Sequence, residues 1–150
     1  MGLPVGRLVC ASNKNNVLTD FLRTGTYDAR RTFYKTTSPS MDILISSNLE
    51  RLLYHVSGSS EKVAGWMQEL SATGKYTVDA ETLAKIQQSF AAGYADDADG
   101  AAEIKARFDG DHYLCDTHTA VASAWPRPGA PTRRWSCSPQ PARSSSRATS

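Results

Sequence analysis

Apolar side chains recur at helical spacing between Ser38 and Ser57, and the chain is organised around this segment. Ser38 can cap the first free amide group, and Pro39 suits the first position of a helix. Asp42 would place a negative charge near the positive end of the helix dipole. One apolar stripe follows, made of Ile45, Leu49, Leu52, Leu53 and Val56. The pattern predicts a single amphipathic helix over residues 38–57.

A short apolar run over residues 5–11 predicts a buried strand of a parallel sheet. Ligands of open α/β sheets gather beyond the carboxyl ends of the strands. The polar residues at that position are Ser12, Asn13, Lys14, Asn15 and Asn16. The three asparagine side chains can cap the next helix or present amide groups to a polar ligand, and both interpretations remain open.

The rest of the chain is predicted to be mostly helical. A short helix begins at Val17 and ends at Gly25, and a loop over residues 26–37 leads to the central helix. Three further helices are expected, one over residues 59–74, one that Asp79 caps and that includes Phe90, and one that starts at Asp97 or Asp99 and includes Phe108. Their apolar stripes are narrow, which predicts an accessory helical layer over about residues 59–108. Trp66 and Met67 are expected to pack in this layer.

An extended segment over residues 109–115 is followed by Asp116, Thr117, His118 and Thr119. An aspartate, two hydroxyl groups and a histidine at the end of an extended segment could form a substrate-binding corner or a helix cap. Both interpretations stay open. Of the two, only the first would give these side chains a role in ligand binding.

Composition and charge exclude several classes of protein. No apolar run is long enough to span a bilayer and the N-terminus lacks a signal-peptide pattern, so we expect a cytoplasmic protein that does not bind membranes. Cys10, Cys115 and Cys137 lack metal-ligand spacing, and no metal is expected. Residues 126–150 contain five arginines and no acidic residue. Because the net charge of the whole chain is +2, residues 1–125 carry a net charge of −3. No aromatic platform accompanies these arginines, so nucleic-acid binding is not expected.

Three stretches of the sequence together resemble the threonine synthases, pyridoxal-phosphate enzymes of the tryptophan-synthase β-like family. They are GLPVGRLVCASNKNNVLTDFLRTGTYD, SPSMDILISSNLERLL and DTHTAVA, and the resemblance runs from about Gly2 to Ala122. It implies a helix-rich α/β fold, with residues 1–125 forming part of a fold type II catalytic domain. It also implies a lyase of threonine biosynthesis that cleaves a carbon–oxygen bond to phosphate. Such enzymes convert O-phospho-L-homoserine and water to L-threonine and phosphate.

The resemblance supplies no catalytic residue. In the family, the lysine that forms the aldimine with pyridoxal phosphate and the glycine-rich phosphate loop both precede the stretch that is present here. We therefore expect a missing N-terminal half and a chain that is inactive alone. Residues expected to line or position the site for the small-molecule substrate, by hydrogen bonding only, are Asn13, Asn15, Asn16, Ser38, Ser40, Asp42, Thr117 and His118.

Residues 126–150 depart from the family pattern. They contain five of the seven prolines and six serines, a composition that predicts disorder. Threonine synthases usually end in a different sequence. Codons for that ending, translated one base later, can give the serine-rich end of this chain. This predicts that the tail is translated out of frame. Two alternatives to the enzyme remain: the non-functional product of a truncated or frameshifted gene, and a small helical interaction module.

Overall fold

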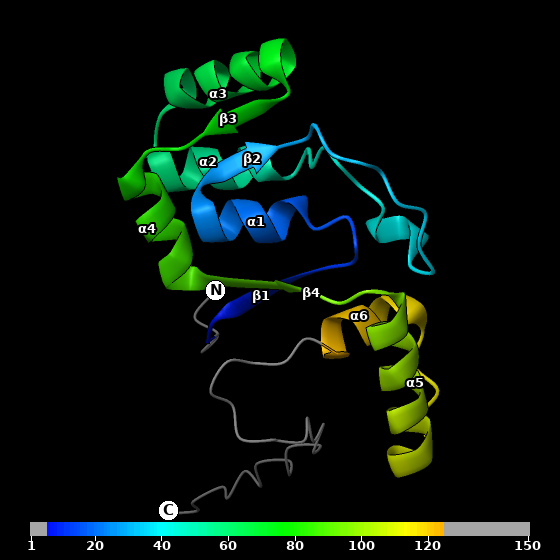
Figure 1. Ribbon diagram of the computed structural model, residues 1–150. Coiled ribbons are helices and arrows are strands. Elements are labelled where there is room, and N and C mark those ends of the chain that lie inside the picture. The colour runs from blue at the N-terminus through cyan, green and yellow to red at the C-terminus, as the bar shows by residue number, and fades with distance from the viewer. Residues whose placement is uncertain (1–5, 125–150) are drawn as a thin grey trace, which may run out of the picture.

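The computed structural model describes residues 6–124 and contains two small sheets and six α-helices within that range (Figure 1). Strands β1 (Leu8–Ser12) and β4 (Phe90–Tyr94) pair in parallel, with Leu8 opposite Phe90, and strands β2 (Thr26–Asp28) and β3 (Lys75–Thr77) pair antiparallel. In chain order the elements are β1 (Leu8–Ser12), α1 (Val17–Thr24), β2 (Thr26–Asp28), the 3₁₀ helix η1 (Pro39–Met41), α2 (Leu49–Ser57), α3 (Ser60–Thr73), β3 (Lys75–Thr77), α4 (Ala80–Ser89), β4 (Phe90–Tyr94), α5 (Asp97–Asp111) and α6 (Thr117–Ala124).

The elements are stacked in layers with α1 between the two sheets. Figure 1 shows α1 on one side of the β1–β4 sheet, and α5 and α6 on the other. Helix α1 contacts both strands of that sheet as well as β2, and α6 contacts β1. Beyond the β2–β3 ribbon lies α3, which contacts β3. The helix that follows β1 (α1) and the helix that follows β4 (α5) therefore lie on opposite sides of the parallel sheet.

The core lies between α1 and the β2–β3 ribbon. The rings of Tyr27 and Tyr76 are stacked at 5.3 Å between centroids, and Phe21 meets Tyr27 edge-on at 5.8 Å. Leu53 of α2 and Ile86 of α4 are fully buried beside them. Aromatic pairs in such geometries add to the stabilisation from burial. This cluster joins α1, α2, α4 and the ribbon into one packed unit.

Helix ends agree with the sequence predictions at most positions. Gly25, Gly58 and Gly74 follow α1, α2 and α3 in the left-handed conformation, with φ of 77°, 67° and 78°. Glycine adopts this conformation without the steric cost of a Cβ atom. The side chains of Ser59 and Asp79 cap α3 and α4. These predicted boundaries are confirmed.

The predicted continuous helix over residues 38–57 is wrong. Only η1 and α2 are helical, and residues 42–48 between them are irregular. Ser38 makes no capping bond, and Ile45 is 66% exposed. The reason is that the side chain of Asp42 accepts hydrogen bonds from outside the segment and does not lie over a helix N-terminus. Leu49 and Leu53 are nevertheless buried, as the stripe predicted.

Other differences concern short strands and one helix end. The segment predicted as a loop contains β2, and Phe90 belongs to β4 and not to α4. Asp96 caps α5, in place of the predicted Asp97 or Asp99, and α5 continues to Asp111 into the segment predicted to be extended. Strand β1 is parallel as predicted, but its first two residues are exposed.

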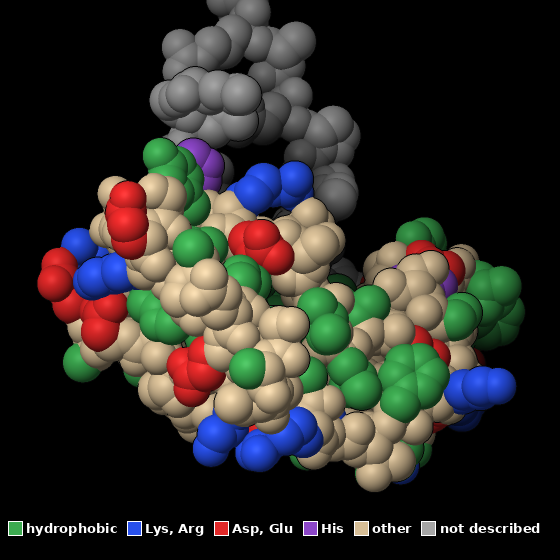
Figure 2. All heavy atoms as spheres, turned by 90° about the horizontal axis from the view of Figure 1, so that it is seen from above, with side chains coloured by type: hydrophobic (Ala, Val, Ile, Leu, Met, Phe, Trp, Pro, Cys, Tyr) green, Lys and Arg blue, Asp and Glu red, His purple; other side chains and the backbone are tan. Residues whose placement is uncertain are grey.

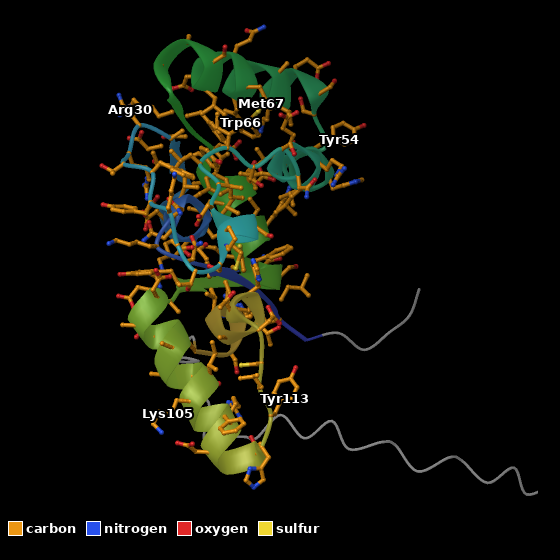
Figure 3. All side chains as sticks on the ribbon, turned by 90° about the vertical axis from the view of Figure 1, so that its right-hand side faces the viewer. Arg30, Tyr54, Trp66, Met67, Lys105 and Tyr113 are labelled. Atoms are coloured by element: carbon orange, nitrogen blue, oxygen red, sulfur yellow. The ribbon has the colours of Figure 1, made fainter. Side chains whose placement is uncertain are left out.

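Helix α3 forms the outer layer and has no fully buried residue. Trp66 and Met67 point from α3 toward the core (Figure 3), and Trp66 lies 6.4 Å from the Tyr76 ring. Their predicted packing role is confirmed. Seen from the side of α3, the surface carries interspersed acidic and basic side chains (Figure 2). Within residues 6–124, no helix is long and apolar enough to cross a membrane. The predicted domain end at residue 125 and the predicted disordered tail lie outside the described residues.

Candidate functional site

A buried network of hydrogen bonds links the loop after β1 to the loop before η1. The side-chain amide of Asn13, 1% exposed, donates to Asp42 Oδ1 at 2.7 Å, to Thr36 Oγ1 at 2.8 Å and to Ser38 Oγ at 3.0 Å. The amide of Asn15, 3% exposed, donates to the same Asp42 oxygen at 2.9 Å and to the Tyr34 carbonyl at 2.8 Å. Asp42 is therefore the shared acceptor of two buried asparagines.

Backbone amides complete this network. The Thr36 amide donates to Asp42 Oδ2 at 3.0 Å, and the Tyr34 amide donates to Asn15 Oδ1 at 2.9 Å. The Asn13 side-chain oxygen accepts from the Asn15 amide at 2.9 Å. Asn13 and Asn15 thus each donate and accept hydrogen bonds within the network, which fixes residues 34–42 against the end of β1.

The hydrogen bonds favour the ionised form of Asp42. Partial burial by itself would raise the pKa of this carboxyl group, but the bonds from Thr36, Asn13 and Asn15 outweigh it and lower the pKa. Asp42 is therefore ionised across the physiological range. A buried cation is not needed, because amide and hydroxyl donors satisfy the carboxylate.

The three asparagines were expected either to cap a helix or to present their amides to a ligand, and the structure gives a different answer for Asn16 than for Asn13 and Asn15. Asn13 and Asn15 direct their amides into the network, so in this structure they position the loop and present no free amide to a ligand. Asn16 is the N-cap residue of α1 but its side chain makes no capping bond; its oxygen accepts from Arg31 at 2.9 Å. Asn16 is half-buried and faces an open crevice.

Ser40 and His118 are brought together although they are far apart in the sequence. The Ser40 amide donates to His118 Nε2 at 3.3 Å. Because Nε2 accepts, the ring proton lies on Nδ1, which is 3.3 Å from Asp116 Oδ1. This contact joins η1 to the start of α6.

The Asp116 segment forms a helix cap, one of the two predicted alternatives. Asp116 Oδ1 accepts from the amides of His118 at 2.9 Å and Thr119 at 3.1 Å. Hydrogen bonds from the Thr119 side chain and amide lower the pKa of Asp116 to about 2. Thr117 is the first residue of α6 and is half-buried. The cap orients His118 toward η1, so the structural interpretation and a role in the site are compatible.

Replacing His118 by alanine removes the acceptor for the Ser40 amide, and we expect η1 to loosen without loss of the fold. Amide hydrogen exchange at Ser40 should become at least severalfold faster, because a lost hydrogen bond of about 1 kcal/mol corresponds to roughly fivefold. His118→Gln, which keeps an acceptor, should retain part of the protection. His55→Ala, on α2, is the control. Equal Ser40 exchange in His118→Ala and the parent protein would contradict the contact.

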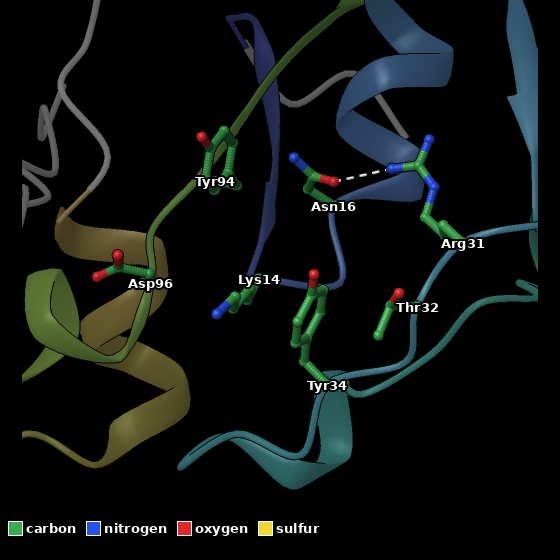
Figure 4. A pocket seen from close by; sticks show the side chains of 7 residues that line it. All are labelled: Lys14, Asn16, Arg31, Thr32, Tyr34, Tyr94 and Asp96. Carbon is green, nitrogen blue, oxygen red and sulfur yellow. Dashed lines mark hydrogen bonds between the residues drawn. The ribbon is translucent and has the colours of Figure 1, made fainter.

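An open crevice of about 380 Å³ lies at the carboxyl ends of β1 and β4 (Figure 4). Its lining residues are Lys14, Asn16, Arg31, Thr32, Tyr34, Tyr94 and Asp96. The Lys14 ammonium group lies 4.3 Å from the centroid of the Tyr34 ring. Because β1 and β4 lead to helices on opposite sides, the crevice occupies a topological switch point, the usual location of ligands in α/β sheets.

The described residues do not by themselves fit pyridoxal phosphate. Of the six lysines, Lys62, Lys85 and Lys105 are paired with carboxylates, and Lys14 is the lysine that lines the crevice. The glycines with positive φ end helices and do not form a phosphate loop. Among residues 6–124, no group of three or more His, Cys, Asp or Glu could hold a metal ion.

Comparison with known proteins gives consistent matches. No family model matches the chain. Human threonine synthase-like 1 is 39% identical over 124 residues, a match that covers 81% of this chain and 17% of the relative. Threonine synthase of Saccharomyces cerevisiae is 36% identical over 135 residues, covering 81% of this chain and 26% of the relative.

Solved structures match the fold as well. Threonine synthase from Brucella melitensis, solved with pyridoxal phosphate bound, superposes with a TM-score of 0.78 and 41% identity, covering 83% of this chain and 27% of that one. The yeast enzyme gives the same TM-score at 35% identity. The fold is thus a helix-rich α/β arrangement that matches part of the fold of these threonine synthases. The chain is similar in sequence to the threonine synthases, and it spans about a sixth to a quarter of the length of the two relatives named above.

Some residues of the site were not predicted from the sequence. Thr36, which links Asn13, Ser38 and Asp42, lies in the segment predicted as a loop and is not among the candidate site residues. Arg31, Tyr34 and Tyr94 line the crevice and also went unrecognised. The position of Tyr34 and Thr36 shortly before the Ser38 segment is a sequence signal that could have identified them as site residues. Tyr94 could be identified only once β4 was known, because it lies at the end of that strand.

Proposed function

We propose that this chain serves as the part of a threonine synthase that shapes and positions the site for the small-molecule substrate. The whole enzyme would convert O-phospho-L-homoserine and water to L-threonine and phosphate in threonine biosynthesis, in the cytoplasm. The single observation that carries the proposal is the joint match in sequence and fold, with 41% identity and a TM-score of 0.78 to a threonine synthase with bound cofactor.

The eight predicted site residues divide into two groups under this proposal. Asn13, Asn15, Ser38 and Asp42 act as positioning residues, because their polar atoms are engaged in the network. Asn16, Ser40, Thr117 and His118 lie at more open positions and are the ones proposed to face the substrate side. Precise positioning of a substrate requires that the side chains in contact with it are held rigidly by hydrogen-bonded neighbours.

The crevice supports the same proposal. It lies where ligands of α/β sheets bind, and Asn16 and Lys14 line it from the loop after β1. Pyridoxal phosphate supplies the electron sink of threonine synthase chemistry. We propose that a complementary polypeptide, the missing N-terminal half, brings the lysine and the glycine-rich loop for that cofactor.

Borohydride reduction in the presence of pyridoxal phosphate tests whether this chain holds the cofactor alone. We expect weak labelling spread over exposed lysines, with Lys14 labelled no more than Lys85, as measured by peptide mass spectrometry. Lys85→Arg and Lys14→Arg should reduce total labelling equally. Preferential, stoichiometric labelling of Lys14 would show that the chain has its own aldimine lysine and would refute the positioning role.

A further inference from the structure

The parallel sheet of β1 and β4 lacks the surroundings that such sheets normally have. Parallel sheets are generally covered on both faces and contain more than two strands. Here α1 covers one face and α6 contacts β1 on the other, lying toward the carboxyl ends of the strands (Figure 1). Leu8 and Val9, at the start of β1, are each 46% exposed. An apolar strand thus remains partly uncovered.

Among the described residues, no strand pairs with the outer edge of β1. The Ser12 carbonyl accepts from the Ala95 amide at 3.0 Å, so Ser12, Cys10 and Leu8 direct their backbone groups toward β4. Val9 and Ala11 alternate with them and direct their amides and carbonyls away from β4. Within residues 6–124, neither strand has a second strand neighbour, and the Val9 and Ala11 groups meet no backbone partner.

The outer side of β4 is less available than that of β1. By the register of the sheet, the Ala92 carbonyl points away from β1, and it accepts from the Arg23 side chain at 3.4 Å. A side chain of α1 thereby occupies an acceptor on the outer side of β4. An added strand consequently finds free backbone groups at β1.

We infer that the outer edge of β1 is a docking site for a β-strand of the polypeptide that supplies the remainder of the threonine synthase fold. This inference rests on the proposed function. The occupant follows from the comparisons, since the solved homologues superpose on 83% of this chain while that match accounts for 27% of theirs. The larger part of the homologous fold therefore lies beyond the matched residues, and strand addition gives it main-chain hydrogen bonds and covers Leu8 and Val9.

A second copy of this chain is a poorer occupant. It offers another five-residue edge with the same two exposed apolar side chains. Stable interfaces bury on the order of 1,000 Å² or more, which a pair of such short edges does not provide. Self-association is accordingly treated as an outcome of the test.

The test uses as its probe the Brucella melitensis threonine synthase chain from which the matched segment has been deleted. Size exclusion with light scattering should show a one-to-one complex with this protein. Val9→Pro removes the outward amide and is tolerated at a sheet edge, so it should weaken the complex at least tenfold while the chain stays folded. Val9→Thr keeps both the amide and the β-branched shape and should bind like the parent protein. Leu114→Ser, at a 71% exposed position elsewhere, is the control.

Circular dichroism of the free variants separates folding from docking. If Val9→Pro is unfolded, Val9→Lys replaces it, because a charge at this half-exposed position opposes burial without changing the backbone. Undiminished binding by the folded variant, absence of any complex, or a homodimer of this chain would each overturn the inference. Failure of the proposed function gives a different result from failure of the docking inference. In that case a complex that Val9→Pro weakens would form, but it would not release phosphate from O-phospho-L-homoserine.

Discussion

Replacement of Asp42 by alanine should lower the free energy of unfolding by about 3 kcal/mol or more. The change removes the shared acceptor of two buried amides. Asn13 keeps Thr36 and Ser38 as acceptors, whereas one N–H of the Asn15 amide is left unpaired. Hydrogen bonds to a charged acceptor contribute about 1.5–3 kcal/mol each, and an unsatisfied buried donor costs about 1–3 kcal/mol. These effects overlap within one network and do not simply add. Urea denaturation followed by circular dichroism measures the loss.

Asp97→Ala is the matched control for this substitution. Asp97 also accepts two hydrogen bonds from the same loop, from the Thr37 amide and hydroxyl, but at an exposed position. Its removal should cost less than about 1 kcal/mol, since exposed partners are satisfied by water. Asp42→Asn keeps one acceptor oxygen and should fall between the two. Equal losses for Asp42→Ala and Asp97→Ala would show that the network is not buried in solution.

The same network predicts a dependence on acid. Because the folded-state pKa of Asp42 lies below its unfolded value, the stabilisation is fully present above the unfolded pKa of about 3.9. It is lost as the pH falls through the lower folded-state pKa. Stability of the parent protein should therefore decline below about pH 4 more steeply than that of Asp42→Asn, which has no charge to lose.

Replacement of Phe21 by alanine should cost about 3–5 kcal/mol, the range for deleting a large buried aromatic side chain. Phe21 is 0% exposed, and its ring lies 5.8 Å from Tyr27 and 5.9 Å from Tyr76. The cavity would separate α1 from the β2–β3 ribbon. The urea midpoint should fall accordingly, and the transition should lose cooperativity if the layers separate.

Phe108→Ala supplies the matched comparison, because Phe108 is 53% exposed on α5. The same deletion there should change stability by less than about 1 kcal/mol. Phe21→Leu should recover much of the loss by refilling the space. A cost below about 1 kcal/mol for Phe21→Ala would mean that the aromatic cluster is not packed as described.

Local signals predicted much of this fold. Glycine after α1, α2 and α3, and Ser59 and Asp79 before α3 and α4, act within one turn of their own helix. Their effects can be read without knowledge of the rest of the molecule. The family resemblance then identified the fold class, which the structural comparison confirms.

Long-range contacts account for the failures. The helix pattern of residues 38–57 was overridden because Asp42 finds buried donors on Asn13 and Asn15, far away in the sequence. Strands β2 and β3 have three residues each, too few for a period-2 pattern to stand out. Ser40 and His118 were both candidate site residues, but their mutual contact could not be predicted without the tertiary structure.

The pairing of Leu8 with Phe90 also has a consequence for how the chain folds during synthesis. Strand β1 is made before its partner β4, which lies about 80 residues later, and at 5–20 residues per second this is a delay of roughly 4–16 s. The intervening helices and the β2–β3 ribbon rely on nearer contacts and can form first, because closing short loops costs less entropy. The parallel sheet is therefore expected to form last, and β1 passes through synthesis as an unpaired apolar strand.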